Sequence, residues 1–223
     1  MRKRKALSVE LLRDIFRIGT TIMTLAFGAA TASAAPTSLM LYGDSLMAGY
    51  GLAQDEGFAA QLQAALAADG YDVTIVNASV SGDTSAAALA RLDWSLGERP
   101  DAVLLGLGGN DMLQGLAPGA LSQNLTTILD RLRADSIPVL LLGMQASPGL
   151  GADYVQSFNA IYPDLARGFG VPLYPFFLEG VALDPALNQA DRIHPNARGV
   201  QSIVKRLLPA VEDLLDRAAQ TTP

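Results

Sequence analysis

Four short segments of the chain carry side chains that could together cleave an ester bond. Ser45 follows the first strongly apolar run of the sequence after residue 38, and the sole histidine, His194, comes three residues after Asp191. A serine becomes a useful nucleophile only when a base takes its proton as it attacks a carbonyl carbon. Because the chain holds no second imidazole, His194 must be that base in any serine mechanism, and Asp191 could orient its ring.

Two other segments could supply hydrogen-bond donors for the oxyanion that forms during such an attack. Gly82, in the run Ser-Val-Ser-Gly-Asp at 79–83, offers a backbone N–H that no side chain shields. Asn110, after two glycines, offers a side-chain amide. The backbone N–H of Ser45 is a third donor. The sequence therefore predicts Ser45, Asp191 and His194 as catalytic residues, and Ser45, Gly82 and Asn110 as the oxyanion hole.

Each of these residues has a simpler interpretation when taken alone. Ser45 could cap a helix or close a turn, and Gly82 and Asn110 could be ordinary turn residues. His194, which precedes a proline, could begin a helix that Asp191 caps. The catalytic interpretation requires the four segments to meet at one place in the fold.

Strand and helix patterns alternate along the chain. Short apolar or β-branched runs predict strands at 39–42, 73–77, 102–107, 138–142 and 171–174. Helical periodicity predicts helices at 58–68, 84–96, 120–134, 153–169 and 196–217, the last interrupted at Pro209. Trp94 is expected to pack partly in the core or against a helix. This alternation predicts an α/β fold, a three-layer α/β/α sandwich around a five-stranded parallel sheet. Sites in such sheets form at the carboxyl ends of the strands, where all four segments fall.

Composition excludes several classes of function. The chain has 223 residues, 50% of them hydrophobic, which is enough for one domain with a large core. The absence of cysteine excludes thiolate metal sites, iron–sulfur clusters, cysteine nucleophiles and disulfides. One histidine and scattered carboxylates form no ligand cluster, and no glycine-rich nucleotide motif is present. We therefore expect no metal site and no nucleotide site.

The first 34 residues have the pattern of an export signal. Residues 1–17 hold six basic and two acidic side chains, 18–35 carry no charge, and Ala-Ser-Ala at 32–34 is a small-x-small cleavage pattern. We predict a cleaved signal peptide at 1–34 and a periplasmic or secreted protein, with an uncleaved membrane anchor as the alternative. The remainder has ten basic and twenty acidic residues, net −10, which argues against nucleic acid or an anionic membrane surface as a partner. We expect no stable membrane span after cleavage, and a monomer.

These segments resemble the GDSL (SGNH) hydrolase family. Its four blocks are matched by Gly-Asp-Ser-Leu at 43–46, by Gly82, by Gly-Gly-Asn-Asp at 108–111, and by Asp191 with His194 and the proline after it. The match spans residue 39 to about 208 and is most similar to the bacterial periplasmic branch of multifunctional thioesterases, lysophospholipases and arylesterases. The resemblance implies a flavodoxin-like strand order 2-1-3-4-5, no cofactor, and one SGNH hydrolase domain at 35–223. It carries over Ser45 as nucleophile, Gly82 and Asn110 as oxyanion donors, and Asp191 and His194 as triad partners.

The predicted function is a serine esterase that hydrolyses carboxylic esters or thioesters through a Ser-His-Asp acyl-enzyme mechanism. The resemblance implies an arylesterase, acyl-CoA thioesterase or lysophospholipase type acting on small-molecule acyl substrates. It also implies that loops near Met112 and Leu150 line the acyl side of the site. Two alternatives stay open: a carbohydrate O-deacetylase on the same fold, which an exposed aromatic platform would favour, and a non-catalytic lipid-binding protein, which needs no triad.

Overall fold

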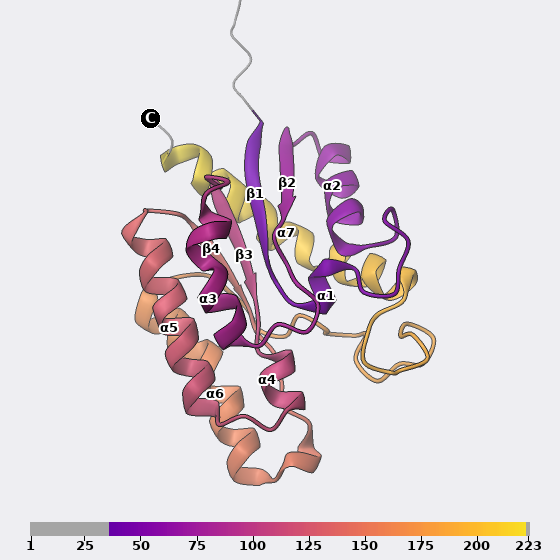
Figure 1. The fold of residues 1–223 in the computed structure, drawn as a ribbon. Coiled ribbons are helices and arrows are strands. Elements are labelled where there is room, and N and C mark those ends of the chain that lie inside the picture. Colours follow the sequence, from indigo (N-terminus) through magenta and orange to yellow (C-terminus); the bar gives the residue numbers. More distant parts are fainter. Residues whose placement is uncertain (1–35, 222–223) are drawn as a thin grey trace, which may run out of the picture. The chain divides into compact units, whose positions relative to one another are not determined.

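Five parallel strands form one sheet in the order β2-β1-β3-β4-β5 (Figure 1). The computed structural model describes residues 36–221, so the predicted signal peptide at 1–34 lies outside the described residues. The strands are β1 (Thr37–Gly43), β2 (Val73–Asn77), β3 (Ala102–Gly106), β4 (Val139–Leu142) and β5 (Leu173–Tyr174). The predicted α/β class and the predicted strand order are both confirmed.

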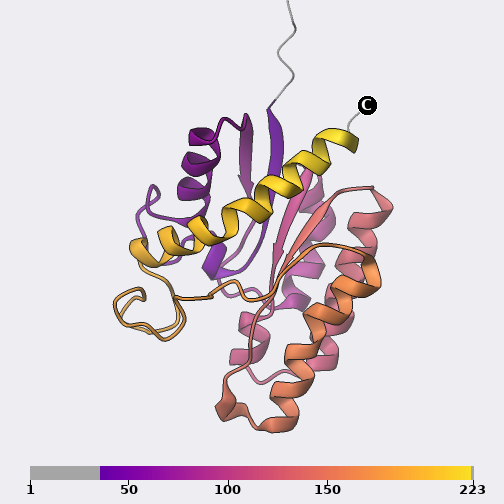
Figure 2. The same ribbon diagram turned by 180° about the vertical axis from the view of Figure 1, so that it is seen from behind.

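Helices cover both faces of the sheet, which confirms the predicted three layers (Figures 1 and 2). Parallel strands are joined by right-handed crossovers, so the direction of each step along the sheet decides the face on which its helix lies. The step from β1 to β2 runs opposite to the other three steps. Accordingly, α2 (Phe58–Ala68) lies with α7 (Ala197–Thr221), whereas α3 (Ser85–Leu96), α5 (Pro118–Ala134) and α6 (Ala152–Phe169) lie on the other face.

Three further elements are too short to show a helical period in the sequence. They are α1 (Ser45–Ala48), α4 (Gly109–Leu113) and the 3₁₀ turn η2 (Pro148–Leu150). The first two begin at or next to a proposed site residue. Among residues 36–221, no helix is long and apolar enough to cross a membrane.

The central strands are buried on both faces. The side chains from Leu39 to Tyr42 in β1 are fully buried, as are most of β3 and β4. In the register, Leu39 lies between Ile75 of β2 and Ala102 of β3. Burying such side chains stabilises the fold by roughly 1.5–3 kcal/mol each. The sheet is thus a rigid base, and the loops at its carboxyl edge are held against it.

The predicted interruption at Pro209 is wrong, because α7 continues through it as one helix (Figure 2). An internal proline removes one hydrogen bond and costs about 3 kcal/mol. Buried side chains on both sides of it, including Val204, Leu207, Val211 and Leu214, pack against the rest of the core. At roughly 1.5–3 kcal/mol each, their packing outweighs the cost of the proline.

The predicted packing of Trp94 in the core is also wrong, since 81% of this residue is exposed. The buried stripe of α3 consists of Ala88, Leu92, Ser95 and Leu96. This stripe follows the helical period, and position 94 falls on the opposite side of the helix.

Candidate active site

Ser45 lies just beyond the carboxyl end of β1. The strand ends at Gly43, and Asp44 caps the short helix α1 by accepting the N–H of Leu46 at 3.1 Å. Ser45 is therefore the first residue of α1. A backbone N–H at a helix start has no carbonyl partner in a preceding turn, so that of Ser45 can serve a ligand.

The serine hydroxyl and the imidazole are in direct contact. Oγ of Ser45 lies 2.8 Å from Nε2 of His194, and Nδ1 of His194 lies 2.7 Å from Oδ2 of Asp191. With Nδ1–H donating to the carboxylate, Nε2 is an acceptor that faces the serine hydroxyl. This arrangement can pass a proton from Ser45 to His194.

Asp191 is held in its ionised form. The backbone N–H groups of His194 and Ile193 donate to Oδ1 at 3.0 and 2.9 Å. They lower the pKa of Asp191 from 3.8 to about 2, and the ring of His194 adds to the same effect. Near neutral pH the carboxylate is therefore an anion, which can stabilise an imidazolium beside it.

Backbone and ring contacts fix the position of His194. The side-chain amide of Gln189 donates to the carbonyls of Tyr50 at 2.8 Å and Pro195 at 3.0 Å, and its backbone N–H donates to the carbonyl of His194 at 2.8 Å. The ring of Tyr50 lies against the imidazole, with 4.6 Å between the ring centroids. These contacts join the turn that carries the histidine to the segment that follows α1.

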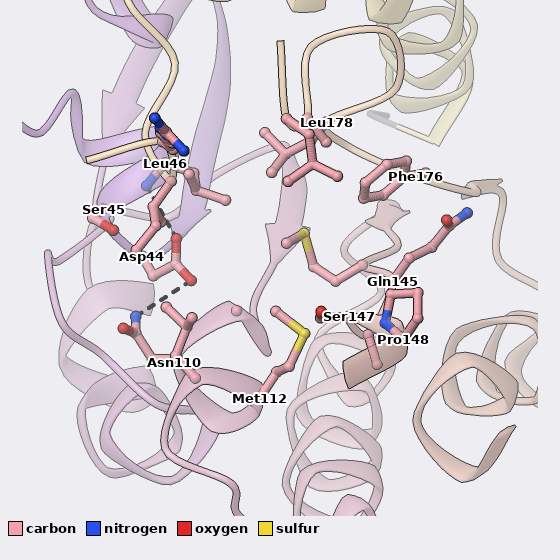
Figure 3. A pocket seen from close by; sticks show the side chains of 18 residues that line it. Asp44, Ser45, Leu46, Asn110, Met112, Gln145, Ser147, Pro148, Phe176 and Leu178 are labelled. Atoms are coloured by element: carbon pink, nitrogen blue, oxygen red, sulfur yellow. Dashed lines mark hydrogen bonds between the residues drawn. The ribbon is translucent and has the colours of Figure 1, made fainter. Parts of the chain in front are cut away.

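Gly82 lies in the loop that follows β2, and Asn110 lies in the short helix α4 that follows β3. Gly82 has a left-handed φ of 89°, which residues with a Cβ rarely adopt. Nδ2 of Asn110 donates to the carbonyl of Asp83 at 2.9 Å, and its other acceptor, Oδ2 of Asp44, is 3.5 Å away (Figure 3). Since 3.5 Å is too long for a strong hydrogen bond, one N–H of this amide can turn to a ligand.

A buried hydrogen-bond network supports the loop that carries Asn110. The carboxylate of Asp111 accepts the N–H of Ser85 at 2.8 Å and its hydroxyl at 2.6 Å, and Asn124 donates to the same hydroxyl at 2.9 Å. Asp111 and Ser85 are 1% and 0% exposed. Fully satisfied buried polar groups favour one geometry. The network joins α4 to the start of α3 and to α5. It therefore fixes the position of Asp111, the residue that follows Asn110.

Asp44 is a buried carboxyl next to these donors. Burial raises the pKa of Asp44 from 3.8 to about 6, against the opposing effect of the Leu46 N–H. The carboxylates of Asp111 and Asp83 raise this pKa further. The charge of Asp44 therefore changes around pH 6, close to the reacting groups.

A largely apolar cavity of about 290 Å³ opens beside Ser45 (Figure 3). Its walls come from the segments 44–46, 109–113, 144–148, 176–183 and 192–193. Figure 3 shows Asp44, Ser45 and Asn110 on one side and Phe176 and Leu178 on another. A cavity with apolar walls and a few polar groups at one end suits an apolar chain attached to a polar reacting centre.

Both loops predicted for the acyl side contribute to the cavity wall. Met112 lines the cavity, and the loop after β4 contributes residues 144–148. Leu150, at the end of η2, is not among the residues that line it. Among the described residues, no group of three or more His, Asp or Glu could hold a metal ion.

All the residues predicted for catalysis and for the oxyanion hole lie beyond the carboxyl ends of the strands, in loops or in the short helices α1 and α4. Sequence reasoning missed Tyr50, whose ring lies against that of His194, and Arg91, which bonds to Gly43, Ala78 and Asp83 beside the site residues. Both contacts join segments that only the folded chain brings together, so no local pattern could have identified them.

Comparisons with known proteins identify relatives of this chain. The model of the GDSL-like Lipase/Acylhydrolase family matches residues 41–201. The chain is 43% identical over 192 residues to Esterase TesA of Pseudomonas aeruginosa, covering 86% of this chain and 96% of that one. It is 40% identical over 206 residues to thioesterase 1/protease 1/lysophospholipase L1 of Escherichia coli strain K12, covering 89% and 96%. A crystal structure of TesA superposes with a TM-score of 0.76 at 43% identity, covering 80% of this chain and 99% of that one.

Proposed function

The chain belongs to the GDSL-like lipase/acylhydrolase family, and we propose that Ser45, His194 and Asp191 catalyse its hydrolysis of carboxylic esters and thioesters. Its relatives of about 40% identity are an esterase and a thioesterase. One observation carries the assignment of residues. The hydroxyl of Ser45 lies 2.8 Å from His194, whose far nitrogen lies 2.7 Å from an ionised Asp191.

In the proposed acylation step, Oγ of Ser45 attacks the carbonyl carbon while its proton moves to Nε2 of His194. The carbonyl oxygen becomes an oxyanion that accepts hydrogen bonds from the N–H groups of Ser45 and Gly82 and from the amide of Asn110. When the tetrahedral intermediate collapses, the bond to the leaving group breaks and His194 returns the proton to the departing alkoxide or thiolate. An acyl group remains on Ser45.

Deacylation repeats these steps with water as the nucleophile. His194 takes a proton from the water as the oxygen attacks the acyl carbon, and the oxyanion again lies against the three donors. Collapse breaks the bond to Oγ of Ser45, which regains its proton from His194. Asp191 stays ionised throughout and stabilises the imidazolium that forms twice in each cycle.

The cavity supports acyl chains of short to medium length as substrates. Its volume of about 290 Å³ lies at the lower end of the range for small-molecule pockets, roughly 300–1,000 Å³. Because the apolar walls belong to the acyl side, the leaving group is less constrained and can be an aryl alcohol, a thiol or a lysophospholipid headgroup. No observation in the described residues specifically favours the deacetylase or the lipid-binding alternative.

We also propose that the protein is exported, because of the basic, apolar and small-residue pattern of residues 1–34. Expression in a bacterial host and N-terminal sequencing of the product would check this. A mature chain that begins near residue 35 in the periplasmic or secreted fraction is expected. A product that keeps Met1 would contradict the proposal.

The catalytic assignment is tested with Ser45→Ala and a matched control, Ser122→Ala, on helix α5. We expect Ser45→Ala to lower kcat for p-nitrophenyl butyrate by a factor of about 10³ or more, and Ser122→Ala to leave it unchanged. Wild-type turnover by clean Ser45→Ala protein would refute the assignment. Fatty-acid binding or acetyl-sugar hydrolysis by a wild-type protein that does not turn over this ester would favour one of the alternatives.

A further inference from the structure

The guanidinium of Arg91, on helix α3, joins the end of β1 to the loop between β2 and α3. Its Nε lies 2.6 Å from the carboxylate of Asp83, Nη1 donates to the carbonyl of Ala78 at 2.6 Å, and Nη2 donates to the carbonyl of Gly43 at 3.4 Å. The guanidinium carbon, Cζ, also lies 4.5 Å from the centre of the Tyr42 ring. The side chain is only 20% exposed, so these contacts are made largely away from solvent.

The partners of Arg91 lie near two of the proposed oxyanion donors in the sequence, Ser45 and Gly82. Gly43 is two residues before Ser45, while Ala78 and Asp83 stand on either side of Gly82. The backbone carbonyl of Asp83 also accepts the amide of Asn110 at 2.9 Å. One side chain therefore connects the segments that carry Ser45 and Gly82 directly, and reaches Asn110 through Asp83.

The start of the loop between β2 and α3 is held at the carbonyl of Leu41, which accepts the N–H of Ala78 at 3.0 Å and the hydroxyl of Ser79 at 3.2 Å. The part around Gly82 has fewer bonds. Val80 donates its N–H to the carbonyl of Gly43 at 3.1 Å, and Asp83 donates to the carbonyl of Val80 at 3.2 Å. Val80 is 44% exposed, and no heavy atom other than its chain neighbours lies within 4 Å of the position a Cβ on Gly82 would take. Packing alone therefore does not set the position of the Gly82 N–H, and the Arg91 contacts on both sides of it become important.

We propose that Arg91 is a positioning residue that sets the spacing of the oxyanion donors of Ser45, Gly82 and Asn110. This inference rests on the proposed function of those donors. A planar guanidinium can direct separate N–H groups at two carbonyls and a carboxylate at once, which an ammonium on a flexible stem cannot do in a fixed geometry. Donors fixed in advance stabilise the oxyanion without reorganising during the reaction.

A purely structural role for Arg91 would have different consequences. Loss of its contacts would then lower the melting temperature, but the folded fraction would turn over substrate normally. In a positioning role, the folded variant itself is slow, because the donors no longer meet the oxyanion. The loss falls on kcat rather than KM, since the donors act mainly on the transition state.

The test compares Arg91→Met and Arg91→Lys with the wild-type protein, at a temperature well below the melting point of each. The matched control is Arg131→Met, which removes an arginine that pairs with Asp93 and Asp135 at the surface of α5. We expect Arg91→Met to lower kcat for p-nitrophenyl butyrate by about 10–100-fold with KM changed by less than about threefold. Arg91→Lys should recover part of this loss, and Arg131→Met should behave as the wild type.

A second readout uses an alkylboronic acid, which forms a tetrahedral anion with a catalytic serine and so resembles the oxyanion intermediate. Its affinity should fall in Arg91→Met by about the same factor as kcat. A folded Arg91→Met protein with wild-type kcat and boronate affinity would overturn the inference. If Arg91→Met does not fold, Asp83→Asn, which weakens the same ion pair, takes its place and is expected to lower kcat in the same direction.

Ser45→Ala, in the same assay, separates the two proposals. If Ser45→Ala keeps its turnover, the proposed function fails whatever the Arg91 variants do. If Ser45→Ala is inactive while the Arg91 variants are fully active, the proposed function stands and the inference about Arg91 is wrong.

Discussion

Oγ of Ser45 and Nε2 of His194 lie 2.8 Å apart, although 149 residues separate them in the sequence. Ser45 follows β1 at the carboxyl edge of the sheet, and His194 lies at the same edge in the turn that precedes α7. Gln189 and Tyr50 join the two segments directly. The contact between Ser45 and His194 thus depends on the fold as a whole.

Replacing His194 with alanine should lower kcat for p-nitrophenyl butyrate by about 10³-fold or more, because the chain contains no other imidazole. Added imidazole should restore part of the activity if the lost group acts as a base. Turnover by His194→Ala at the wild-type rate, measured with continuous release of p-nitrophenol, would contradict the assignment.

Asp191→Asn should lower kcat by roughly 10³–10⁴-fold with little change in KM, because an amide can stabilise the wrong tautomer of the imidazole. The folded state lowers the pKa of Asp191 from 3.8 to about 2, so its ionised form stabilises the fold. That contribution is complete above about pH 4 and is lost as the pH falls towards 2. Urea unfolding should therefore show the variant's deficit in stability at pH 7 and a smaller deficit at pH 3. A deficit that grows on acidification would contradict this.

Asp44→Asn should become more stable relative to the wild type as the pH rises. The pKa of Asp44 is raised from 3.8 to about 6 by burial, so the wild type is most favoured below about pH 4 and loses stability as the pH rises through 6. The asparagine has no charge to bury, so the difference between the two proteins should grow by on the order of 2–3 kcal/mol between pH 4 and 8. Asp55→Asn, at an exposed position, is the control. A flat difference for Asp44→Asn would contradict the prediction.

Gly82→Ala should slow catalysis more than it destabilises the fold. At a φ of 89° an added Cβ strains the backbone by roughly 1–2 kcal/mol, although no neighbouring atom blocks it. Relief of that strain would rotate the Gly82 N–H, so we expect a loss in kcat of about 10–100-fold. Gly119→Ala, in the first turn of α5, is the control and should keep its activity. Equal kcat in both variants would remove Gly82 from the oxyanion hole.

Phe176→Ala should shift the preferred acyl chain to a longer one. Phe176 forms part of the cavity wall, so its removal enlarges the space beside Ser45. In a series of p-nitrophenyl esters from acetate to decanoate, the maximum in kcat/KM should move by two or more carbons. Phe169→Ala, near the end of α6, is the control. An unchanged optimum in Phe176→Ala would mean that the acyl chain binds elsewhere.

Most of the fold follows from patterns that are local in the sequence. The strands at 73–77 and 102–106 and the helix at 58–68 were predicted almost residue for residue, because β-branched runs and helical periodicity depend on near neighbours. The continuous helix at Pro209 was not predicted, since packing across the core decides it. The exposure of Trp94 was missed although the helical period of α3 places this residue opposite the buried stripe. The short helices α1 and α4 are each less than two turns long and leave no periodic signal.

Some residues of the site could be predicted from the sequence and others could not. Ser45, Gly82, Asn110, Asp191 and His194 could be proposed because each stands in a short segment of typical composition after a strand. Arg91 could not, because its role arises from contacts with Gly43, Ala78 and Asp83 that only the folded chain brings together. The left-handed backbone of Arg192, with a φ of 61°, likewise has no signal in its residue type.

Covalent labelling tests the central claim most directly. A p-nitrophenyl alkylphosphonate transfers its phosphonyl group to an activated serine oxygen and releases p-nitrophenolate, so the site of attack can be mapped by mass spectrometry of the peptides. We expect one phosphonyl group per chain, on Ser45, with loss of esterase activity in proportion, no label in Ser45→Ala, and slow labelling in His194→Ala. Complete inactivation with the label on another residue, or full activity after Ser45 is labelled, would contradict the account.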